Sequence, residues 1–209
     1  MPPETLLAFD TSAAHCAAAL LLPDGRCLIR VEDMAKGQAE RLIPLLEELL
    51  AEAGIGWNDL AAIGVGTGPG NFTGVRISVA AARGLALSLG VAAIGVTRLE
   101  ALAHGLPRPV TVVEDARREE VYLQHFGADG PDAAGLHPLA GLTVTGPVTG
   151  SAAAALGAEP LQPAMPLIQA IARIAATRLG TPQPRPAPFY LRGADAAPPS
   201  DPPPVILDA

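Results

Sequence analysis

The sequence predicts an α/β protein in which helices pack on a mixed β-sheet. Short apolar runs bounded by turn residues open the chain, and segments with apolar residues at helical spacing then alternate with further short runs. The first hundred residues follow the order βββαβαβ, which requires both antiparallel and parallel strand pairs. With 209 residues, 49% of them hydrophobic, the chain can bury the core of one large domain or of two small ones.

Three strands are expected first, at residues 6–9, 16–22 and 26–32. The turn residues Pro23, Asp24 and Gly25 lie between the second and third runs. Turn chemistry between two apolar runs predicts a hairpin.

The first helix is expected at residues 42–53, where leucines recur at helical spacing and Gly54 offers a stop. Pro44 has no amide donor, so we expect this helix to start near Arg41 or to kink at the proline. A strand at 61–65 then leads into a glycine-rich loop. A helix at 74–89 and a strand at 91–96 follow it.

The second half is less regular. A short helix is expected at 98–104, and neighbouring strands are expected at 110–114 and 120–126. Residues 166–179 carry apolar side chains on one helical face. From residue 181 onward prolines dominate, which is typical of an extended or flexible segment.

Composition argues against two classes of protein. The formal net charge is −7 with a single lysine, Lys36, so the chain is a poor candidate for gripping a nucleic-acid backbone by itself. Aromatic residues make up only 3%, too few for a base-stacking surface. Charges, Gly or Pro interrupt each apolar run before it reaches membrane length, and the first residues lack a secretory signal. We therefore expect a cytoplasmic protein that does not enter a membrane.

The loop GTGPGNFTGVRIS at residues 66–78 has two interpretations. It follows a strand and opens a helix, so its amides could attract a phosphate. However, it contains no Gly-Lys-Ser/Thr, which excludes a P-loop, and its glycines do not give the G-x-G-x-x-G spacing. Glycines also permit positive φ and close approach of two backbones. We favour this second interpretation, in which the loop is an elbow that lets two backbone segments come close. The phosphate site remains the alternative.

Asp10, Thr11 and Ser12 come directly after the first strand. An aspartate there can hold a metal-bound water, and the hydroxyls can meet a phosphate. The same residues can also simply cap the strand end as a turn. The sequence does not choose between these roles.

Other candidates for chemistry are weak. The four histidines are scattered and form no His-x-x-x-His pair, so a metal site is not expected. No local pattern marks a nucleophile with its base. Residues 115–120 form a dense charge run, which is typical of a solvated turn whose acids and bases pair with one another. The histidines are His15, His104, His125 and His137.

The two long helices predict a partner. The 42–53 helix is apolar over a wide arc, and the 74–89 helix is built mainly from Val, Ala, Leu, Ser and Gly. One apolar stripe of each must cover the sheet, but the excess apolar surface suggests a docking face. Small side chains would let a partner helix come close.

Several of these segments together resemble the bacterial TsaB (YeaZ) family. They are Leu7-Ala8-Phe9-Asp10-Thr11-Ser12, the stretch QAERLIPLL from Gln38 to Leu46, the loop GTGPGNFTGVRIS, Asp115-Ala116-Arg117 with Glu120-Val121-Tyr122, and Tyr190-Leu191-Arg192. They occur in the family's order and span the chain from end to end. The loop with its Phe-Thr-Gly-x-Arg continuation is the most specific of them.

The resemblance implies an α/β protein with the actin-like ATPase (ribonuclease H-like) fold, made of two lobes that each contain a mixed β-sheet and packed helices. It places the N-terminal lobe with the partner-binding helices at 1–98, a smaller degenerate C-terminal lobe at 99–195, and a Pro-rich flexible tail at 196–209. The family acts in making N6-threonylcarbamoyladenosine at position 37 of tRNAs that read codons beginning with A. The resemblance implies that this chain is the non-catalytic partner that binds and activates TsaD and that acts together with TsaE.

The resemblance also implies a set of sites. Partner binding, to TsaD or to a second copy as a homodimer, is assigned to Leu42, Leu45, Leu46, Leu49, Val75, Val79, Ala82 and Ala86. A weak nucleotide contact is assigned to Asp10, Thr11 and Ser12. No catalytic residue, no metal, no direct tRNA binding and no tightly bound cofactor are expected, with ATP or ADP left open at the junction with TsaD.

Some residues of this chain depart from the pattern of its relatives, and these departures bear on whether the chain could be an enzyme. TsaD-type relatives carry a metal-binding His-x-x-x-His pair that this chain lacks, and Asn71 replaces a common Ser in the loop. The alternative is an enzyme of the same superfamily, either an ATP-dependent kinase-like phosphotransferase or a metallopeptidase. The missing metal histidines count against it.

Overall fold

A computed structural model gives the fold of the chain and describes residues 4–192. Its first sheet has five strands in the order β3-β2-β1-β4-β5. The first three strands pair antiparallel, and β4 and β5 join β1 in parallel. The strands are β1 (Leu6–Asp10), β2 (His15–Leu21), β3 (Cys27–Asp33), β4 (Ala62–Gly66) and β5 (Ala92–Val96).

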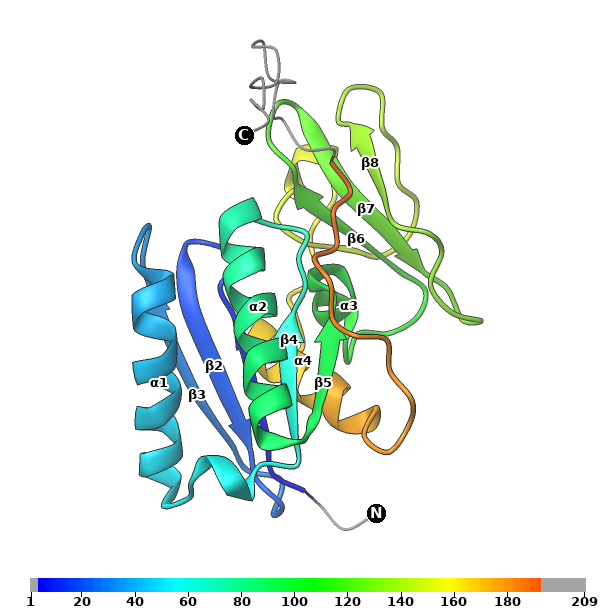
Figure 1. Cartoon of the computed structure of the whole chain (residues 1–209). Helices are drawn as coiled ribbons and strands as arrows, with labels where there is room; N and C mark the ends of the chain where they lie inside the picture. The colour runs from blue at the N-terminus through cyan, green and yellow to red at the C-terminus, as the bar shows by residue number, and fades with distance from the viewer. Residues whose placement is uncertain (1–3, 193–209) are drawn as a thin grey trace, which may run out of the picture.

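Both faces of this sheet are covered by helices. On one face lie α1 (Gln38–Ala53) and α2 (Phe72–Leu89), side by side, and on the other lies α4 (Leu167–Thr177) (Figure 1). Side chains alternate across a strand, so Leu7 and Phe9 of β1 pack toward α1 and α2, whereas Leu6 and Ala8 pack toward α4. This double coverage explains why every residue of β1 is buried.

Helix α1 begins four residues earlier than the leucine pattern predicted. It starts at Gln38 and ends at Gly54, whose left-handed conformation (φ 70°) closes it. Pro44 lies inside the helix and is exposed. We expected the helix to start near Arg41 or to kink at Pro44, and the start lies three residues before Arg41.

The second sheet has four strands in the order β8-β7-β6-β9. They are β6 (Val110–Asp115), β7 (Glu120–Phe126), β8 (Gly135–Pro138) and β9 (Val148–Thr149), and the short helix α3 (Arg98–Ala103) packs on β6 and β7. Their pairing repeats that of β3-β2-β1-β4. A fifth strand is absent from the described part of this sheet. Two single-turn 3₁₀ helices, Trp57–Asp59 and Ala154–Leu156, complete the secondary structure of residues 4–192.

The last helix crosses between the two halves of the chain. The proposed boundaries put α4 in the range 99–195, yet it packs on β1, β2 and β4 of the first sheet. Its Ile168 and Ile171 join the core cluster of Leu6 and Ala8. The division at residue 98 therefore stays a proposal. Helix α4 follows that boundary in the sequence but packs on the first lobe.

Residues 181–192, which we call the strap, run from the end of α4 past β5 to the turn between β6 and β7 (Figure 1). The Phe189 amide donates to the Thr67 carbonyl (2.8 Å), and the Arg192 guanidinium donates to the Ala116 carbonyl (2.9 Å). The strap therefore links both lobes. The predicted Pro-rich tail, 196–209, lies outside the described residues.

Helix α2 corrects one expectation. By length and composition it is apolar enough to cross a membrane, although the sequence reasoning found no such run. Core helices pass the same test, and α2 packs Val75, Val79 and Ala82 against the sheet. Burial against the sheet therefore accounts for one side of the helix, 33% of which is buried.

The packing of α4 yields a stability prediction. Ile171 is 1% exposed, so Ile171→Ala should lower the free energy of unfolding by about 2–5 kcal/mol. Trp57, the single tryptophan, packs on the opposite face of the same sheet and reports the transition by fluorescence in urea. If α4 were an independent unit, Trp57 would unfold at the wild-type midpoint, and that result would contradict the assignment. Val31→Ala, at a 52% exposed position, is the control and should change stability little.

Candidate functional site

The three polar residues that end the first strand are buried and bonded to the protein itself. Asp10, Thr11 and Ser12 are each at most 2% exposed. The Thr11 hydroxyl donates to the Gly74 carbonyl (2.6 Å), and the Ser12 hydroxyl donates to Asp10 Oδ2 (2.9 Å). The hydroxyls that could meet a phosphate thus already have partners within the chain.

His15, at the start of β2, joins this cluster. Its Nε2 lies 2.9 Å from Asp10 Oδ2, the same oxygen that accepts from Ser12. The sequence analysis left His15 out of the candidate site, because it considered the four histidines only as possible metal ligands. The sequence did contain a feature that could have revealed this contact. Asp10 and His15 flank the short connection between two strands that we expected to be neighbours. Ser12 and His15 both bond the Asp10 carboxylate and not each other, so they do not form a nucleophile–base pair.

The glycine loop lies directly on the end of β1. A Cβ at Gly66 would overlap the Asp10 carboxylate, one at Gly70 would overlap the Ser12 carbonyl, and one at Gly74 would overlap the Thr11 carbonyl. The Asn71 amide donates to the Ser12 carbonyl at 2.6 Å. Gly70 and Gly74 are therefore required because two backbones touch there, and Gly66 leaves room for the Asp10 carboxylate.

Amides in the first turn of α2 are also hydrogen-bonded within the chain. Asn71 is the N-cap, and its Oδ1 accepts from the Gly74 amide at 2.9 Å. This bond satisfies an amide that an anion would otherwise use. On its other side the loop reaches α3, because the Arg98 amide donates to the Gly68 carbonyl (2.7 Å).

The predicted partner residues lie in the core and not on the surface. The four leucines of α1 are at most 1% exposed and the four residues of α2 at most 5%, and all eight belong to one cluster with the sheet. The most apolar stripe of each helix covers the sheet, because that burial removes the largest apolar area from water. These residues are Leu42, Leu45, Leu46, Leu49, Val75, Val79, Ala82 and Ala86. Any docking through this helix pair must use other side chains.

The outward side of the same helices still carries large apolar groups. Leu87 is 82% exposed, Phe72 40% and Ile43 37%. We define the outer face by the exposed residues of both helices. They are Ala39, Glu40, Ile43, Pro44, Glu47, Glu48, Ala51 and Glu52 on α1, and Phe72, Thr73, Arg76, Ala80, Gly84, Leu87 and Ser88 on α2. Since three large apolar side chains are exposed on two adjacent helices, this face is the candidate interaction surface.

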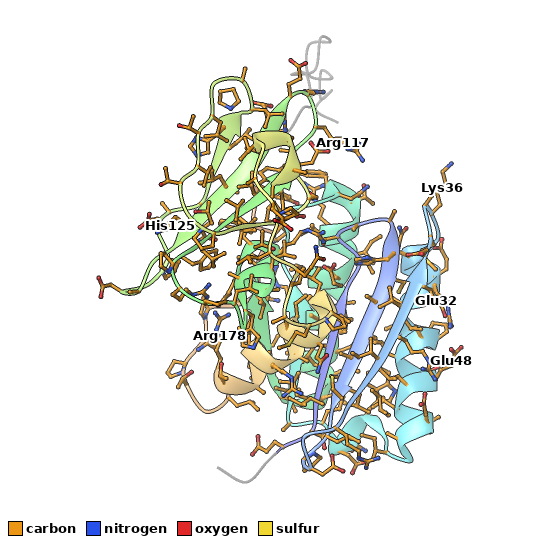
Figure 2. The ribbon with its side chains drawn as sticks, turned by 180° about the vertical axis from the view of Figure 1, so that it is seen from behind. Glu32, Lys36, Glu48, Arg117, His125 and Arg178 are labelled. Carbon is orange, nitrogen blue, oxygen red and sulfur yellow. The ribbon has the colours of Figure 1, made fainter. Side chains whose placement is uncertain are left out.

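The two sides of the outer face differ. Beyond α1, Arg41 binds Glu32 of β3 and Glu48, which point outward from this edge in Figure 2. Hydrogen bonds from Arg41 hold the pKa of both carboxyl groups below its usual value. Beyond α2, the Phe72 ring stacks on Tyr190 of the strap (centroids 4.9 Å apart), and the Arg76 guanidinium lies 3.7 Å from the Phe72 centroid.

The remaining candidates carry structural roles. The turn between β6 and β7 holds Arg117, Arg118 and Glu119 at positive φ, and Arg192 forms an ion pair with Glu120 (2.5 Å). His125 bonds Thr111 through Nδ1 (3.0 Å). Burial, with Arg173 and Arg108 nearby, lowers the pKa of His104. Across residues 4–192, no three His, Cys, Asp or Glu side chains come together as metal ligands.

The order β3-β2-β1-β4-β5, repeated in part by the second sheet, defines an actin-like ATPase (ribonuclease H-like) fold. YeaZ from Pseudomonas aeruginosa has the same fold, with a TM-score of 0.73 and 30% identity over 90% of this chain and 100% of that chain. A second structure is described as an uncharacterized protein with similarity to peptidase YEAZ from Pseudomonas aeruginosa. It has a TM-score of 0.74 and 29% identity over the same shares of the two chains.

Comparison of sequences supports the same relationship as the comparison of structures. The family model described as "TsaD: tRNA N6-adenosine threonylcarbamoyltransferase" matches residues 31–188. The tRNA threonylcarbamoyladenosine biosynthesis protein TsaB of Escherichia coli is 36% identical over 129 residues, which cover 59% of this chain and 55% of that protein. The chain thus spans about half the length of this curated relative. An uncharacterized protein of Mycobacterium tuberculosis is 34% identical over 206 residues, covering 93% of this chain and 95% of that protein. The chain belongs to the TsaB (YeaZ) family, as the sequence motifs indicated.

Two glycines of one helix test the elbow. Gly74→Ala should strongly destabilise the protein, because its Cβ would overlap the Thr11 carbonyl. Gly84→Ala is the matched control, since a Cβ there meets nothing within 4 Å and should stabilise the helix by about 0.5–1 kcal/mol. Thermal unfolding of both variants measures the difference. Equal stability of the two would contradict the close approach of the loop to β1.

Proposed function

We propose that this chain is a non-catalytic partner subunit in the formation of N6-threonylcarbamoyladenosine at position 37 of tRNAs that read codons beginning with A. It binds and activates TsaD and acts together with TsaE in the cytoplasm. The pathway is suggested by relatives named as threonylcarbamoyladenosine biosynthesis proteins. The non-catalytic role is carried by one observation: Asp10, Thr11 and Ser12 bond to the chain itself.

The enzymatic alternatives find less support. A kinase-like phosphotransferase needs polar groups free to hold a nucleotide, and here the loop backbone occupies the end of β1. One structural relative is described as similar to a peptidase; a metallopeptidase needs a ligand cluster, and the described residues contain none. We therefore assign no catalytic residue and no resident metal or tightly bound cofactor. A nucleotide such as ATP or ADP would contact Asp10, Thr11 and Ser12 weakly, at the junction with TsaD.

Docking is proposed to use the outer face of α1 and α2. This face presents Leu87, Phe72 and Ile43 to solvent and small residues, Ala80 and Gly84, between them. Small side chains allow a partner helix to approach closely, and an interface concentrates its energy in a few apolar anchors. In isolation the same face would pair two copies, so homodimer and heterodimer compete.

Direct tRNA binding is not part of this proposal. The chain has net charge −7 and one lysine, so it lacks the cationic density that binding to a phosphate backbone requires. TsaD would then supply both the chemistry and most of the contact with tRNA.

Reconstitution tests the proposal. TsaD, TsaE and threonylcarbamoyl-AMP should modify tRNA well only when this chain is added, and the chain alone should give no product. Leu87→Glu should keep the fold, because the side chain is 82% exposed, but should weaken TsaD binding by about tenfold or more by burying an unpaired charge at the interface. Modification should fall with binding, measured by calorimetry and by nucleoside analysis.

Val31→Glu is the matched control. It adds the same charge at another exposed apolar position, 52% exposed on the edge strand β3, away from the outer face. It should bind TsaD as the wild type does. If Leu87→Glu also bound and activated TsaD normally, docking through this face would be wrong. Product formation by the chain alone would refute the non-catalytic role.

A further inference from the structure

Consecutive residues at the end of the strap contact different lobes. The Phe189 amide donates to the Thr67 carbonyl of the first lobe, and the Tyr190 ring stacks on Phe72 of α2. The next residue, Leu191, packs against the cluster of buried side chains from α3, β6 and β7 in the second lobe. Since neighbouring Cα atoms are about 3.8 Å apart, the contacts with one lobe fix where the chain meets the other.

Side-chain contacts hold Tyr190 in place. Its ring centroid lies 4.9 Å from that of Phe72, and its hydroxyl accepts a hydrogen bond from Arg76 Nε (2.9 Å). The Arg76 guanidinium also lies over the Phe72 ring. Nevertheless, Tyr190 is 44% exposed and Phe72 is 40% exposed. A contact between half-exposed groups can open and close while the core stays folded.

Arg192 holds the turn between β6 and β7. All three residues of this turn, 117–119, have positive φ, at 62°, 54° and 59°. Residues with a Cβ adopt this left-handed conformation at a cost, and three in succession persist only where the surroundings hold them. The Arg192 guanidinium donates to the Ala116 carbonyl (2.9 Å) before the turn and pairs with Glu120 (2.5 Å) after it. Its donors therefore bridge the two ends of the turn.

The end of the strap depends on these side chains because the preceding residues offer few other bonds. Pro186 is buried beside Gly95 of β5, so the strap is fixed at that point. The prolines at 182, 184, 186 and 188 have no amide to donate. Tyr190 and Arg192 then lie two residues apart, each bonded to a different lobe. Displacing one therefore removes a constraint on the other.

We propose that the end of the strap is a latch between the lobes. The Tyr190 ring on Phe72 positions Arg192, and Arg192 keeps the turn 117–119 in its left-handed conformation. While the ring is seated, little further chain entropy is lost when the guanidinium binds its acceptors. When the ring leaves Phe72, that positioning is lost and the turn relaxes.

The latch gives the outer face a route to the second lobe. Phe72 belongs to that face, and a partner that covers the exposed edges of both rings binds the latched state more tightly than the open one. By linkage, such a partner raises the latched population and stabilises the turn. Tyr190 and Arg192 act here as positioning residues. This response rests on the proposed docking of TsaD, whereas the latch itself does not.

Amide hydrogen exchange of the full chain, followed by NMR, tests the latch. The Ala116 amide donates to the Glu120 carbonyl (2.9 Å), so its exchange reports whether the turn is closed. Tyr190→Ala should speed this exchange about tenfold, and Phe72→Ala should do the same by removing the other half of the stack. Tyr190→Phe keeps the stack and should stay within about threefold of the wild type.

Two further variants complete the test. Leu87→Ala removes another exposed apolar side chain of α2, about 22 Å along the helix from Phe72, and should leave the exchange unchanged. Arg192→Lys should speed the exchange as Tyr190→Ala does, since one ammonium cannot replace a forked guanidinium. Wild-type exchange at Ala116 in both stack variants would overturn the latch, as would an unchanged rate in Arg192→Lys. Exchange that speeds equally in β1 would indicate global unfolding and would overturn it too.

A second arm adds saturating TsaD, with binding followed by calorimetry. Exchange at Ala116 should slow in the wild type and not in Tyr190→Ala. Slowing in both would show that TsaD covers the turn directly, and would refute the response through the latch. A chain that binds TsaD but whose turn ignores Tyr190→Ala refutes only the latch. A chain that shows the latch but never binds TsaD refutes the proposed function instead.

Discussion

The contact between the glycine loop and the end of β1 is the constraint on which the rest of the structure depends. Backbone meets backbone there, with the loop carrying Gly70 and Gly74 where any side chain would collide. The Asn71 amide and the Thr11 hydroxyl close the contact with hydrogen bonds of 2.6 Å each. It fixes where α2 begins, and hence how α2 lies beside α1 (Figure 1). Through Thr67 and Gly68 it also anchors the strap and α3.

This contact changes what an ATPase-like fold can do. In the position where such a fold could present hydroxyls and a carboxylate to a ligand, Thr11, Ser12 and Asp10 hold the protein together. Their burial makes them costly to expose and well suited to stiffen the first lobe. The helix pair that the contact positions is left with an outer face of mixed apolar and charged residues. The proposed partner role follows from this division between a closed interior and an available surface.

Much of this could be predicted from the sequence, and the failures have physical causes. Apolar runs and turn residues predicted β1 to β5 and the four helices, and the glycines predicted the elbow. The strands β8 and β9 were missed because they are four and two residues long, too short to show a period. The residues predicted for docking are buried because helical periodicity identifies the strongest apolar stripe, and that stripe covers the sheet. Ile43 and Leu87 stand outside the stripe, where only the packed structure shows their exposure. His15 was overlooked because it belongs to no motif, although the short connection between β1 and β2 places it beside Asp10.

The most direct test of this account is a calorimetric titration of the lone chain with magnesium ATP. If the end of β1 is closed by the chain's own backbone and hydroxyls, ATP should bind in the high micromolar range or more weakly, a binding free energy of about −5 kcal/mol. Sub-micromolar binding, lost on Thr11→Val, would contradict the account, because it would show that these groups hold a nucleotide and that the loop opens to admit it.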